Sequence, residues 1–532
     1  MSDVGDALVS RSDIARMAGV RRPAVTNWER RHPDFPRPVA PDAGSTEPEA
    51  FRAAQVLDWL SGRTIPSNAL QPGEPAGTTY GDRFRSALRG GRSGGLLSVV
   101  EQLARREADR LRGRLHMPDY LNLLLSLVFV QSQDEERWAR YLKDPGAALR
   151  DLELPEEYGQ LPLSDVVRLL EHNPPASRDE SRQAFDRLLA LLRDTDARTA
   201  GEFFTPPSVS RVMARSLAGQ ASPAKRLHDP FCRSGELLAG YLDVVAEQGG
   251  TAPEEISGRA PHKGASRLTL MNLQLRGVDR PVVRPGFFTP SLGPVDPPGS
   301  FDAVIANPPF AVRIDNATSP PGYWRYGVTR SGDFDWLQYV VSRLAPGGRA
   351  AVLMPSGPGF RSGAEGRARA RMVEDGVVEC VMALPPQLFG LTRIQTQVWF
   401  LRPSLGRREE VLFVDGAGLG HMAGPNRRVL SDSEIDRLVR AYVSWRQARE
   451  AGRDHAGTPG LSRAVDPEAI AALDYRLDPP LLVHGDAPME SAVDPDAVKD
   501  RLAELSDELS RLGAQAQAVD SALEERLRRY GL

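Results

Sequence analysis

The sequence contains little cysteine and no long apolar run. Cys232 and Cys380 are its only cysteines in 532 residues, and neither has a Cys or His partner at metal-ligand spacing. This pattern argues against a disulfide framework and a structural zinc site, and we expect no bound metal. No stretch approaches the ~18 uninterrupted apolar residues that a membrane-spanning helix needs. Charges also occur throughout the first thirty residues, where a secretion signal would be apolar. We therefore expect a cytoplasmic protein that does not enter a membrane.

The sequence also lacks an excess of either charge. Lys and Arg number 67 and Asp and Glu number 70, which leaves a net charge of −3. Because this balance does not attract a polyanion, any binding of nucleic acid must rest on a local basic surface. Hydrophobic residues make up 41% and charged residues 26%, close to globular averages, so wholesale disorder and collagen-like repeats are excluded. At roughly 150 residues per domain, the length predicts three or four domains.

The amino-terminal segment, residues 1–62, reads as a helix-turn-helix module. Ser12–Ala18 forms a capped helical turn, Gly19 interrupts it, and a second helix starts at Pro23. A third helix at Phe51–Leu60 would close the module. Residues 11–37 contain seven arginines against three acidic residues, which suits phosphates and base edges. The side chains expected to contact DNA are Arg21, Arg22, Thr26, Asn27 and Arg30. The alternative is a small protein-docking bundle.

Composition divides the remaining chain into five parts. Residues 63–95 are rich in Gly, Pro and Ser and predict a flexible linker. Apolar residues recur with helical spacing over residues 96–198. At 120–130 they cover more of the helix surface than one face, which predicts a helix buried inside a helical bundle. We expect residues 199–404 to form the catalytic domain. The fold of 405–490 stays open, and 491–532 predicts a long amphipathic helix that needs a partner.

The part from residue 199 to 404 predicts an α/β fold. Short β-rich runs at Phe301–Ala306, Arg349–Met354 and Val377–Met382 alternate with helical stretches, and Gln397–Leu401 adds a late strand. Strands separated by helices indicate an open, mostly parallel sheet. In such sheets ligands collect outside the carboxyl ends of the strands.

Asn307-Pro308-Pro309-Phe310 directly follows the first of these strands. An exocyclic adenine amine is a poor nucleophile because its lone pair is delocalised into the ring. If the Asn307 side-chain oxygen and the Pro308 carbonyl each accept an amine hydrogen, the lone pair turns toward an electrophile. Pro309 would help to stiffen the turn, and Phe310 could stack on a base extruded from the duplex. The alternative is a turn that merely ends a strand.

Several segments in order resemble the modification subunits of type I restriction-modification systems, which are S-adenosylmethionine-dependent adenine-N6 DNA methyltransferases. The resemblance spans about Glu101 to Asp478. The segments that carry it are Ala108–Gly113 with Asp119–Tyr120, Gly201–Pro207, Asp229–Gly235, Asn307–Phe310, Leu344–Arg349, Phe360–Gly366 and Leu384–Phe389.

The resemblance implies a Rossmann-like methyltransferase domain with S-adenosylmethionine as cofactor and double-stranded DNA as substrate. It implies cofactor contacts at Phe204, Thr205, Pro206, Asp229, Pro230, Cys232, Ser234 and Gly235, with Asn307 to Phe310 as the catalytic residues. In this family a separate specificity subunit reads the target sequence. The carboxy-terminal helix offers a docking surface for such a specificity subunit or for a restriction subunit.

The cofactor segments depart from the family pattern at four positions. Arg233 and Glu236 replace glycines, Ala260 stands where the family has an acid for the ribose, and Phe287 stands where an aspartate contacts the cofactor's adenine. Either other contacts rebuild the pocket, or the chain is a catalytically degenerate DNA-binding protein on a methyltransferase fold. Methylation of RNA or of protein glutamine is a third option. The arginines from Arg361 to Arg371 could either contact a DNA strand or form the solvent-exposed face of a helix.

Overall fold

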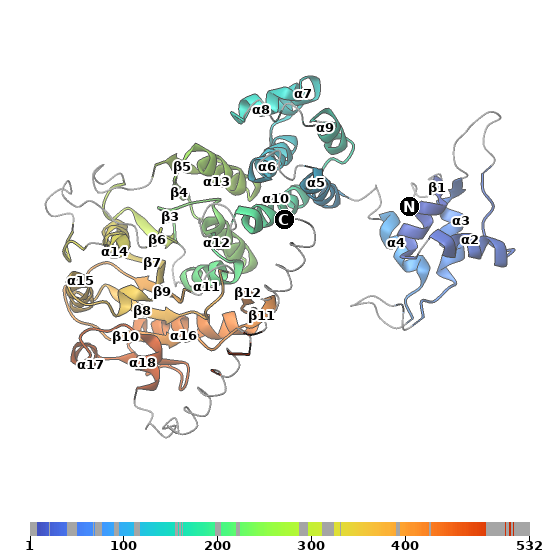
Figure 1. Cartoon of the computed structure of the whole chain (residues 1–532). Coiled ribbons are helices and arrows are strands. Elements are labelled where there is room, and N and C mark those ends of the chain that lie inside the picture. The colour runs from blue at the N-terminus through green and yellow to red at the C-terminus, as the bar shows by residue number, and fades with distance from the viewer. Residues whose placement is uncertain are drawn as a thin grey trace. The chain divides into compact units, whose positions relative to one another are not determined.

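Figure 1 shows the chain as a computed structural model. The structure describes residues 8–20, 22–39, 50–66, 69, 77–89, 95–110, 117–154, 158, 161, 163–196, 204–219, 224–286, 296–310, 324–329, 331–389, 394–424, 427–485, 506, 510, 511 and 514. The long helix predicted at 491–532 therefore lies outside the described residues, apart from four isolated positions. The chain divides into two compact units, residues 1–214 with 222–288, and residues 215–221 with 289–532.

The amino-terminal module has the two helices and the glycine turn that its sequence predicts. Helices α1 (Arg11–Ala18) and α2 (Arg22–Arg31) pack together, and Gly19 between them adopts a φ of 68°, which a side chain would disfavour. Strands β1 (Leu8–Ser10) and β2 (Ala50–Arg52) pair antiparallel, and α3 (Ala53–Ser61) follows directly. The module has its own core, whose fully buried members are Ile14, Ala18, Val25, Phe51, Ala53, Val56, Leu60 and Phe84.

The segment predicted as a flexible linker, residues 63–95, contains a helix. Helix α4 (Tyr80–Arg89) packs against α1 and α3, and Phe84 is fully buried there. Thr79 and Asp82 cap its start, because the Asp82 carboxylate accepts hydrogen bonds from the Thr79 backbone and hydroxyl. The sequence does not predict this helix, because it has few apolar residues and lies between Gly-rich and Ser-rich segments. The linker prediction is thus corrected for Tyr80–Arg89.

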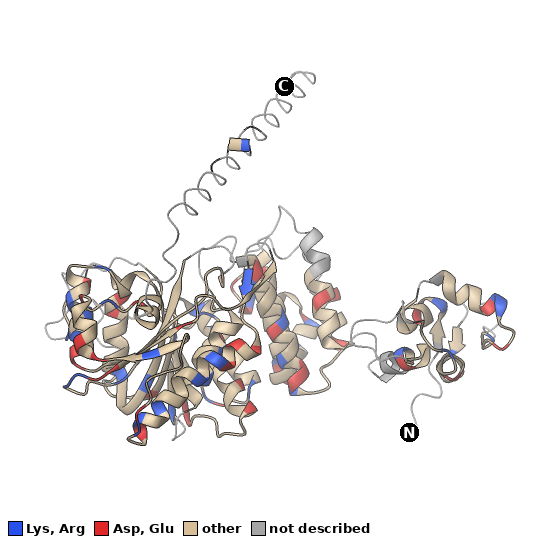
Figure 2. Cartoon of the chain, turned by 90° about the horizontal axis from the view of Figure 1, so that it is seen from below, with Lys and Arg blue, Asp and Glu red and all other residues tan. Residues whose placement is uncertain are grey.

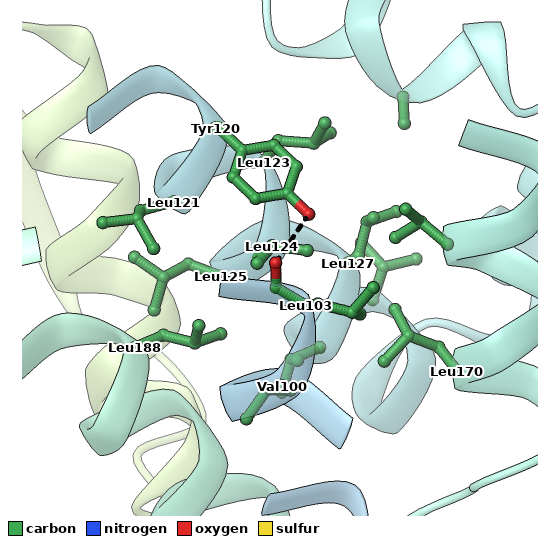
Figure 3. Packing of buried hydrophobic residues seen from close by; sticks show 14 of the residues in the cluster. Val100, Leu103, Tyr120, Leu121, Leu123, Leu124, Leu125, Leu127, Leu170 and Leu188 are labelled. Atoms are coloured by element: carbon green, nitrogen blue, oxygen red, sulfur yellow. Dashed lines mark hydrogen bonds between the residues drawn. The ribbon is translucent and has the colours of Figure 1, made fainter. Parts of the chain in front are cut away.

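A helical bundle follows, as its apolar spacing predicts. It consists of α5 (Leu96–Arg110), α6 (Met117–Gln133), α7 (Glu135–Lys143), α8 (Gly146–Asp151), α9 (Leu163–Glu171) and α10 (Arg178–Asp196). Helix α6 is buried on nearly all sides, and Figure 3 shows its leucines packed against Val100, Leu170 and Leu188 of neighbouring helices. The Tyr120 hydroxyl reaches the Leu103 carbonyl at 3.5 Å and the Ser126 hydroxyl donates to the Asn122 carbonyl at 2.9 Å, so these buried hydroxyls have partners.

The central sheet has nine strands in the order β13-β10-β8-β9-β7-β6-β3-β4-β5. In the first unit, β3 (Arg226–Asp229), β4 (Glu255–Ala260) and β5 (Val282–Pro285) pair in parallel. Helices α11 (Pro207–Ala218), α12 (Glu236–Glu247) and α13 (Lys263–Leu275) alternate with them. Leu268, Met271 and Leu275 of α13 belong to the bundle core, so α13 and the bundle share one apolar cluster.

In the second unit, β6 (Phe301–Ala306) pairs in parallel with β7 (Leu344–Pro355). Strand β9 (Thr396–Leu401) lies antiparallel between β7 and β8 (Val378–Ala383). Helices α14 (Gly332–Arg343) and α15 (Ala364–Glu374) connect these strands, with a short 3₁₀ turn, η5 (Gly357–Gly359), after β7. The mostly parallel α/β sheet and the late strand predicted from sequence are both confirmed.

The part whose fold the sequence left open, residues 405–490, extends this sheet. Strand β10 (Val411–Asp415) pairs in parallel with β8, and β13 (Ser462–Val465) pairs antiparallel with β10. A hairpin of β11 (His421–Gly424) and β12 (Arg427–Val429) precedes α16 (Asp432–Glu450), and α17 (Pro467–Ala472) and α18 (Pro479–His484) follow β13. The Tyr442 hydroxyl of α16 donates to buried Glu379 of β8 at 2.7 Å. Within the described residues, none of the helices combines the length and apolarity required to cross a bilayer.

Candidate active site

The turn Asn307–Phe310 begins where the buried strand β6 ends. Residues 303–306 of β6 are almost completely buried, and the strand stays paired with β7 up to Ala306. Pro308 and Pro309 have no N–H to continue the ladder, so the strand stops here. Asn307 is 3% exposed, Pro308 is buried, and Pro309 and Phe310 are half-buried. The structure thus holds the amide and carbonyl acceptors at the carboxyl edge of the sheet, where the sequence predicts them.

Trp336 of α14 holds this turn through a hydrogen bond. Its indole Nε1 donates to the Pro309 carbonyl at 3.1 Å, and the ring itself is buried. Helix α14 is fixed at its start, because the Ser331 hydroxyl accepts from the Asp333 N–H at 3.3 Å. A hydrogen bond from a buried side chain removes rotational freedom from the proline carbonyl. No sequence motif identifies Trp336 as part of the site.

The loop after β3 centres on a buried carboxyl group. Asp229 accepts from the Phe231 N–H at 2.9 Å. Burial raises the pKa of Asp229 to about 8; the Phe231 hydrogen bond acts against this rise, and the charge of Glu236 adds to it. This carboxyl group is therefore mostly protonated at neutral pH. A cationic ligand beside it would favour the ionised form.

Two glycines let this loop pack tightly. Gly235 has a φ of 73°, and a Cβ there would come within 2.8 Å of the Thr269 side chain. A Cβ on Gly258 of β4 would lie 2.3 Å from the Cys232 sulfur and 3.1 Å from the Asp229 carbonyl oxygen. The Cys232 thiol donates to that same carbonyl at 3.3 Å, and burial raises the pKa of the thiol. Cys232 is therefore a small packing residue beneath the loop.

Glu236 turns its carboxylate back onto the loop. One of its oxygens accepts from the Thr205 N–H at 3.2 Å. The other accepts from the Ser234 N–H at 3.2 Å and from the Ser234 hydroxyl at 2.9 Å. The Ser234 carbonyl is held in turn by Asn272 at 2.8 Å. Three donors from two segments thus converge on one carboxylate, and such a set binds anions. The sequence marks Glu236 only as a departure from glycine.

The remaining cofactor positions predicted from sequence lie on the same segments. Phe204 and Pro206 are half-buried on either side of buried Thr205, and Pro230 is buried after Asp229. Ala260, at the end of β4, is fully buried and offers no carboxylate. Phe287 lies outside the described residues. The donors at Thr205 and Ser234 thus suit the carboxylate group of an amino acid and the Asp229 carboxylate suits its ammonium group, while Ala260 supplies nothing for a ribose.

Four of the five residues predicted to contact DNA, Arg22, Thr26, Asn27 and Arg30, lie on α2. Thr26, Asn27 and Arg30 are exposed, and Arg30 donates to the Asn27 side chain at 3.2 Å. Arg21 and the side chain of Arg22 lie outside the described part of the chain. Arg11 is not available for DNA, because its guanidinium forms a two-point ion pair with Glu29 at 2.8 Å. The role of this face in DNA binding stays a prediction.

Comparisons with known proteins identify relatives of the chain. The family N-6 DNA Methylase matches residues 176–490. The chain is 26% identical over 311 residues to the type I restriction enzyme HindI methylase subunit of Haemophilus influenzae, an alignment covering 57% of this chain and 68% of that protein. It is 24% identical over 368 residues to the MjaIX methylase subunit of Methanocaldococcus jannaschii, covering 65% and 63%. The chain thus spans about two thirds of the length of these curated relatives.

Two solved structures share the fold. One is the type I restriction-modification methyltransferase subunit from Streptococcus thermophilus, with a TM-score of 0.59, 21% identity, and coverage of 73% of this chain and 99% of that chain. The other comes from a study of complex assembly in a type I restriction-modification system, with a TM-score of 0.57, 20% identity, and coverage of 79% and 99%. These likenesses confirm the predicted Rossmann-like methyltransferase fold.

The contact between Gly258 and Cys232 yields a test of the loop packing. Gly258→Ala is expected to lower the melting temperature markedly, because the added methyl must push the loop away from β4; overpacking of this kind costs about 1–3 kcal/mol. Adding Cys232→Ala should recover part of the loss, since it removes the sulfur that the methyl meets. Gly424→Ala, where a Cβ would meet nothing within 4 Å, is the control. Equal melting temperatures for Gly258→Ala and the control would refute this packing.

Proposed function

The chain belongs to the N-6 DNA methylase family, and from this we propose that it is an S-adenosylmethionine-dependent DNA methyltransferase that modifies adenine at N6. Its place is in a restriction-modification system or a related defence system. The observation that carries the proposal is the turn Asn307–Phe310, which holds two hydrogen-bond acceptors rigidly at the carboxyl end of β6.

Asn307 and Pro308 activate the target amine. The Asn307 side-chain oxygen and the Pro308 carbonyl each accept one amine hydrogen, which draws the hydrogens out of the purine plane and frees the lone pair. Both acceptors are already oriented, so little reorganisation accompanies the reaction. Pro309 keeps the turn rigid, and Phe310 stacks on the adenine after it leaves the duplex. With the cofactor bound, the nitrogen would gain a methyl group as the methyl–sulfur bond breaks, and the nitrogen would release one proton.

The segments around β3 hold the cofactor. S-adenosylmethionine, when bound, supplies an electrophilic methyl carbon on a positively charged sulfur. The ionised Asp229 carboxylate pairs with the ammonium group of the methionine part. The N–H groups of Thr205 and Ser234, with the Ser234 hydroxyl, suit its carboxylate. Phe204, Pro206, Pro230, Cys232 and Gly235 shape the walls around these groups.

The amino-terminal module binds double-stranded DNA through α2 in this proposal. Arg21, Arg22, Thr26, Asn27 and Arg30 supply its phosphate and base contacts. The relatives are named as subunits of type I restriction enzymes, and we propose that this chain also assembles with specificity and restriction subunits. The carboxy-terminal helix at 491–532 is the segment we assign to that docking.

A second candidate function is a catalytically degenerate DNA-binding protein. Two observations favour it: Ala260 offers no carboxylate to a ribose, and Glu236 already occupies the donors suited to a cofactor carboxylate. Calorimetric titration of S-adenosylmethionine separates the two functions. Intact DNA binding without heat at millimolar cofactor would leave only the degenerate protein.

Methyl transfer should depend on the Asn307 amide oxygen. With DNA from cells that lack adenine methylation, Asn307→Ala is expected to reduce the formation of N6-methyladenine at least 100-fold, as the loss of one aligned transition-state hydrogen bond does. Labelled S-adenosylmethionine and nucleoside analysis give the rate. Asn307→Asp retains an acceptor oxygen and should keep measurable activity. An undiminished rate in Asn307→Ala would refute the proposed role of the turn.

Trp336 should act as a positioning residue. Trp336→Phe keeps an aromatic side chain but removes the N–H that donates to Pro309, together with part of the ring volume. We expect kcat to fall about five- to tenfold while KM for S-adenosylmethionine stays unchanged. Trp445→Phe, which loses a similar bond to Glu410 at 3.2 Å on α16, is the control and should leave kcat unchanged. If both variants lower kcat alike, Trp336 has only a structural role.

Glu236 should compete with the cofactor. Glu236→Gln removes a negative charge from donors suited to the cofactor carboxylate, so we expect S-adenosylmethionine to bind about five- to tenfold more tightly, a change of about 1.0–1.4 kcal/mol. Isothermal titration measures the affinity. Glu247→Gln, on the same helix and half exposed, serves as the matched control. Weaker binding in Glu236→Gln would mean that this carboxylate helps to hold the cofactor instead.

A further inference from the structure

A basic pocket lies at the start of α15, in the second unit. It has a volume of about 630 Å³, within the ~300–1,000 Å³ range typical of ligand sites. Its lining includes Phe360, Ser362, Arg367, Arg369, Asp474 and Arg476. Basic and acidic residues are mixed over the described helices (Figure 2). This pocket departs from that mixture, because three arginines face one aspartate.

Arg369 forms the floor of the pocket. It is 2% exposed, and its guanidinium donates to the carbonyls of Tyr475 at 2.6 Å, Arg361 at 2.8 Å and Pro358 at 2.9 Å. Burial lowers the pKa of Arg369 to about 10, so the group remains charged at neutral pH. A buried cation solvated by carbonyl dipoles attracts an anion to the space above it.

The far wall is held in an unusual backbone conformation. Asp474 and Tyr475 both adopt left-handed φ angles, 52° and 54°, which residues other than glycine rarely adopt. The bonds from Arg369 to the Tyr475 carbonyl, and to the Asp474 carbonyl at 3.4 Å, stabilise this bend. The bend leaves Arg476 exposed at the rim of the pocket.

The rim combines cations with an aromatic ring. Arg367 and Arg476 are exposed, and Phe360 is 48% exposed although it is a large apolar side chain. Arginines beside an exposed aromatic ring suit a nucleic-acid strand, because the arginines contact phosphates while a base stacks on the ring.

Contacts through α14 connect the pocket to the turn Asn307–Phe310, which we call the target turn. The Arg361 guanidinium, next to Phe360, bonds the Asp333 carboxylate at 3.1 Å, and Trp336 one turn later holds the Pro309 carbonyl. In addition, β6 and β7 are parallel neighbours, so the segments that follow them leave the same edge of the sheet. The pocket and the turn are thus parts of one scaffold.

We propose that this pocket binds the DNA strand close to the target adenine, with a phosphate against Arg367 and Arg476 and a base stacked on Phe360. This inference rests on the proposed function, and it adds a DNA contact that neither the target turn nor α2 provides. Two contacts beside the flipped nucleotide hold the strand while the base is out of the stack.

The test uses the full chain and a fluorescent duplex of mixed sequence. We expect Phe360→Ala, Arg367→Ala and Arg476→Ala each to weaken DNA binding about fivefold or more, and each arginine variant to reduce the slope of log affinity against log salt by about 1. Arg453→Ala removes an exposed arginine after α16 and is the charge-matched control. Methylation assays on the same variants should show a raised KM for DNA and an unchanged KM for S-adenosylmethionine.

The outcomes separate this inference from the proposed function. If the wild type binds and methylates DNA while the pocket variants match Arg453→Ala, the inference is overturned and the function stands. A raised KM for S-adenosylmethionine, or wild-type chain that binds no DNA, also overturns it. DNA binding that depends on the pocket but yields no methylated adenine supports the pocket and removes the enzyme function.

Discussion

The proposed chemistry depends on two consecutive prolines that follow a buried strand. Without N–H groups, Pro308 and Pro309 cannot extend the ladder of β6, so the chain turns and leaves Asn307 and a proline carbonyl at the edge of the sheet. The Trp336 indole bonds Pro309 from the buried side. This bond fixes the residue that directly follows the proposed acceptor Pro308. The acceptor then needs little reorganisation when an amine arrives, and in a buried site that saving can account for much of a rate enhancement. The neighbouring helix α14 and the parallel strand β7 support the turn.

The segments around β3 depend on a buried carboxyl group, two glycines and the charge of Glu236. Burial leaves Asp229 with a raised pKa, so binding of a cationic ligand beside it would be coupled to release of a proton from the carboxyl group. Glycines at 235 and 258 allow the loop to pack against α13 and β4, with Cys232 as filler. Glu236 then satisfies donors that a glycine at that position would leave available. Glu236 thus places a negative charge on these donors.

Arginine content alone overstates the surface available for DNA. Arg11 is paired with Glu29 inside the amino-terminal module, Arg361 with Asp333, and Arg369 is buried among carbonyls. Exposed cations such as Arg30 and Arg367 are left for a polyanion, and exposed Arg476 lies 3.7 Å from the Asp478 carboxylate. In a chain with a net charge of −3, attraction to DNA therefore depends on where a few arginines are exposed rather than on how many there are.

The sequence by itself determined the elements whose signals are local. Alternating apolar runs predict β6, β8 and β9, the broad stripe predicts α6, and the proline pair marks the end of a strand, because each depends on a short window of side chains. Helix α4 was missed because its burial depends on contacts with α1 and α3, which no local pattern reports. Tertiary structure alone decided that Trp336 reaches Pro309, that Gly258 meets Cys232 and that Arg369 bonds a loop about a hundred residues later. These contacts join residues distant in sequence, and only the packing of the complete sheet and its helices brings them together.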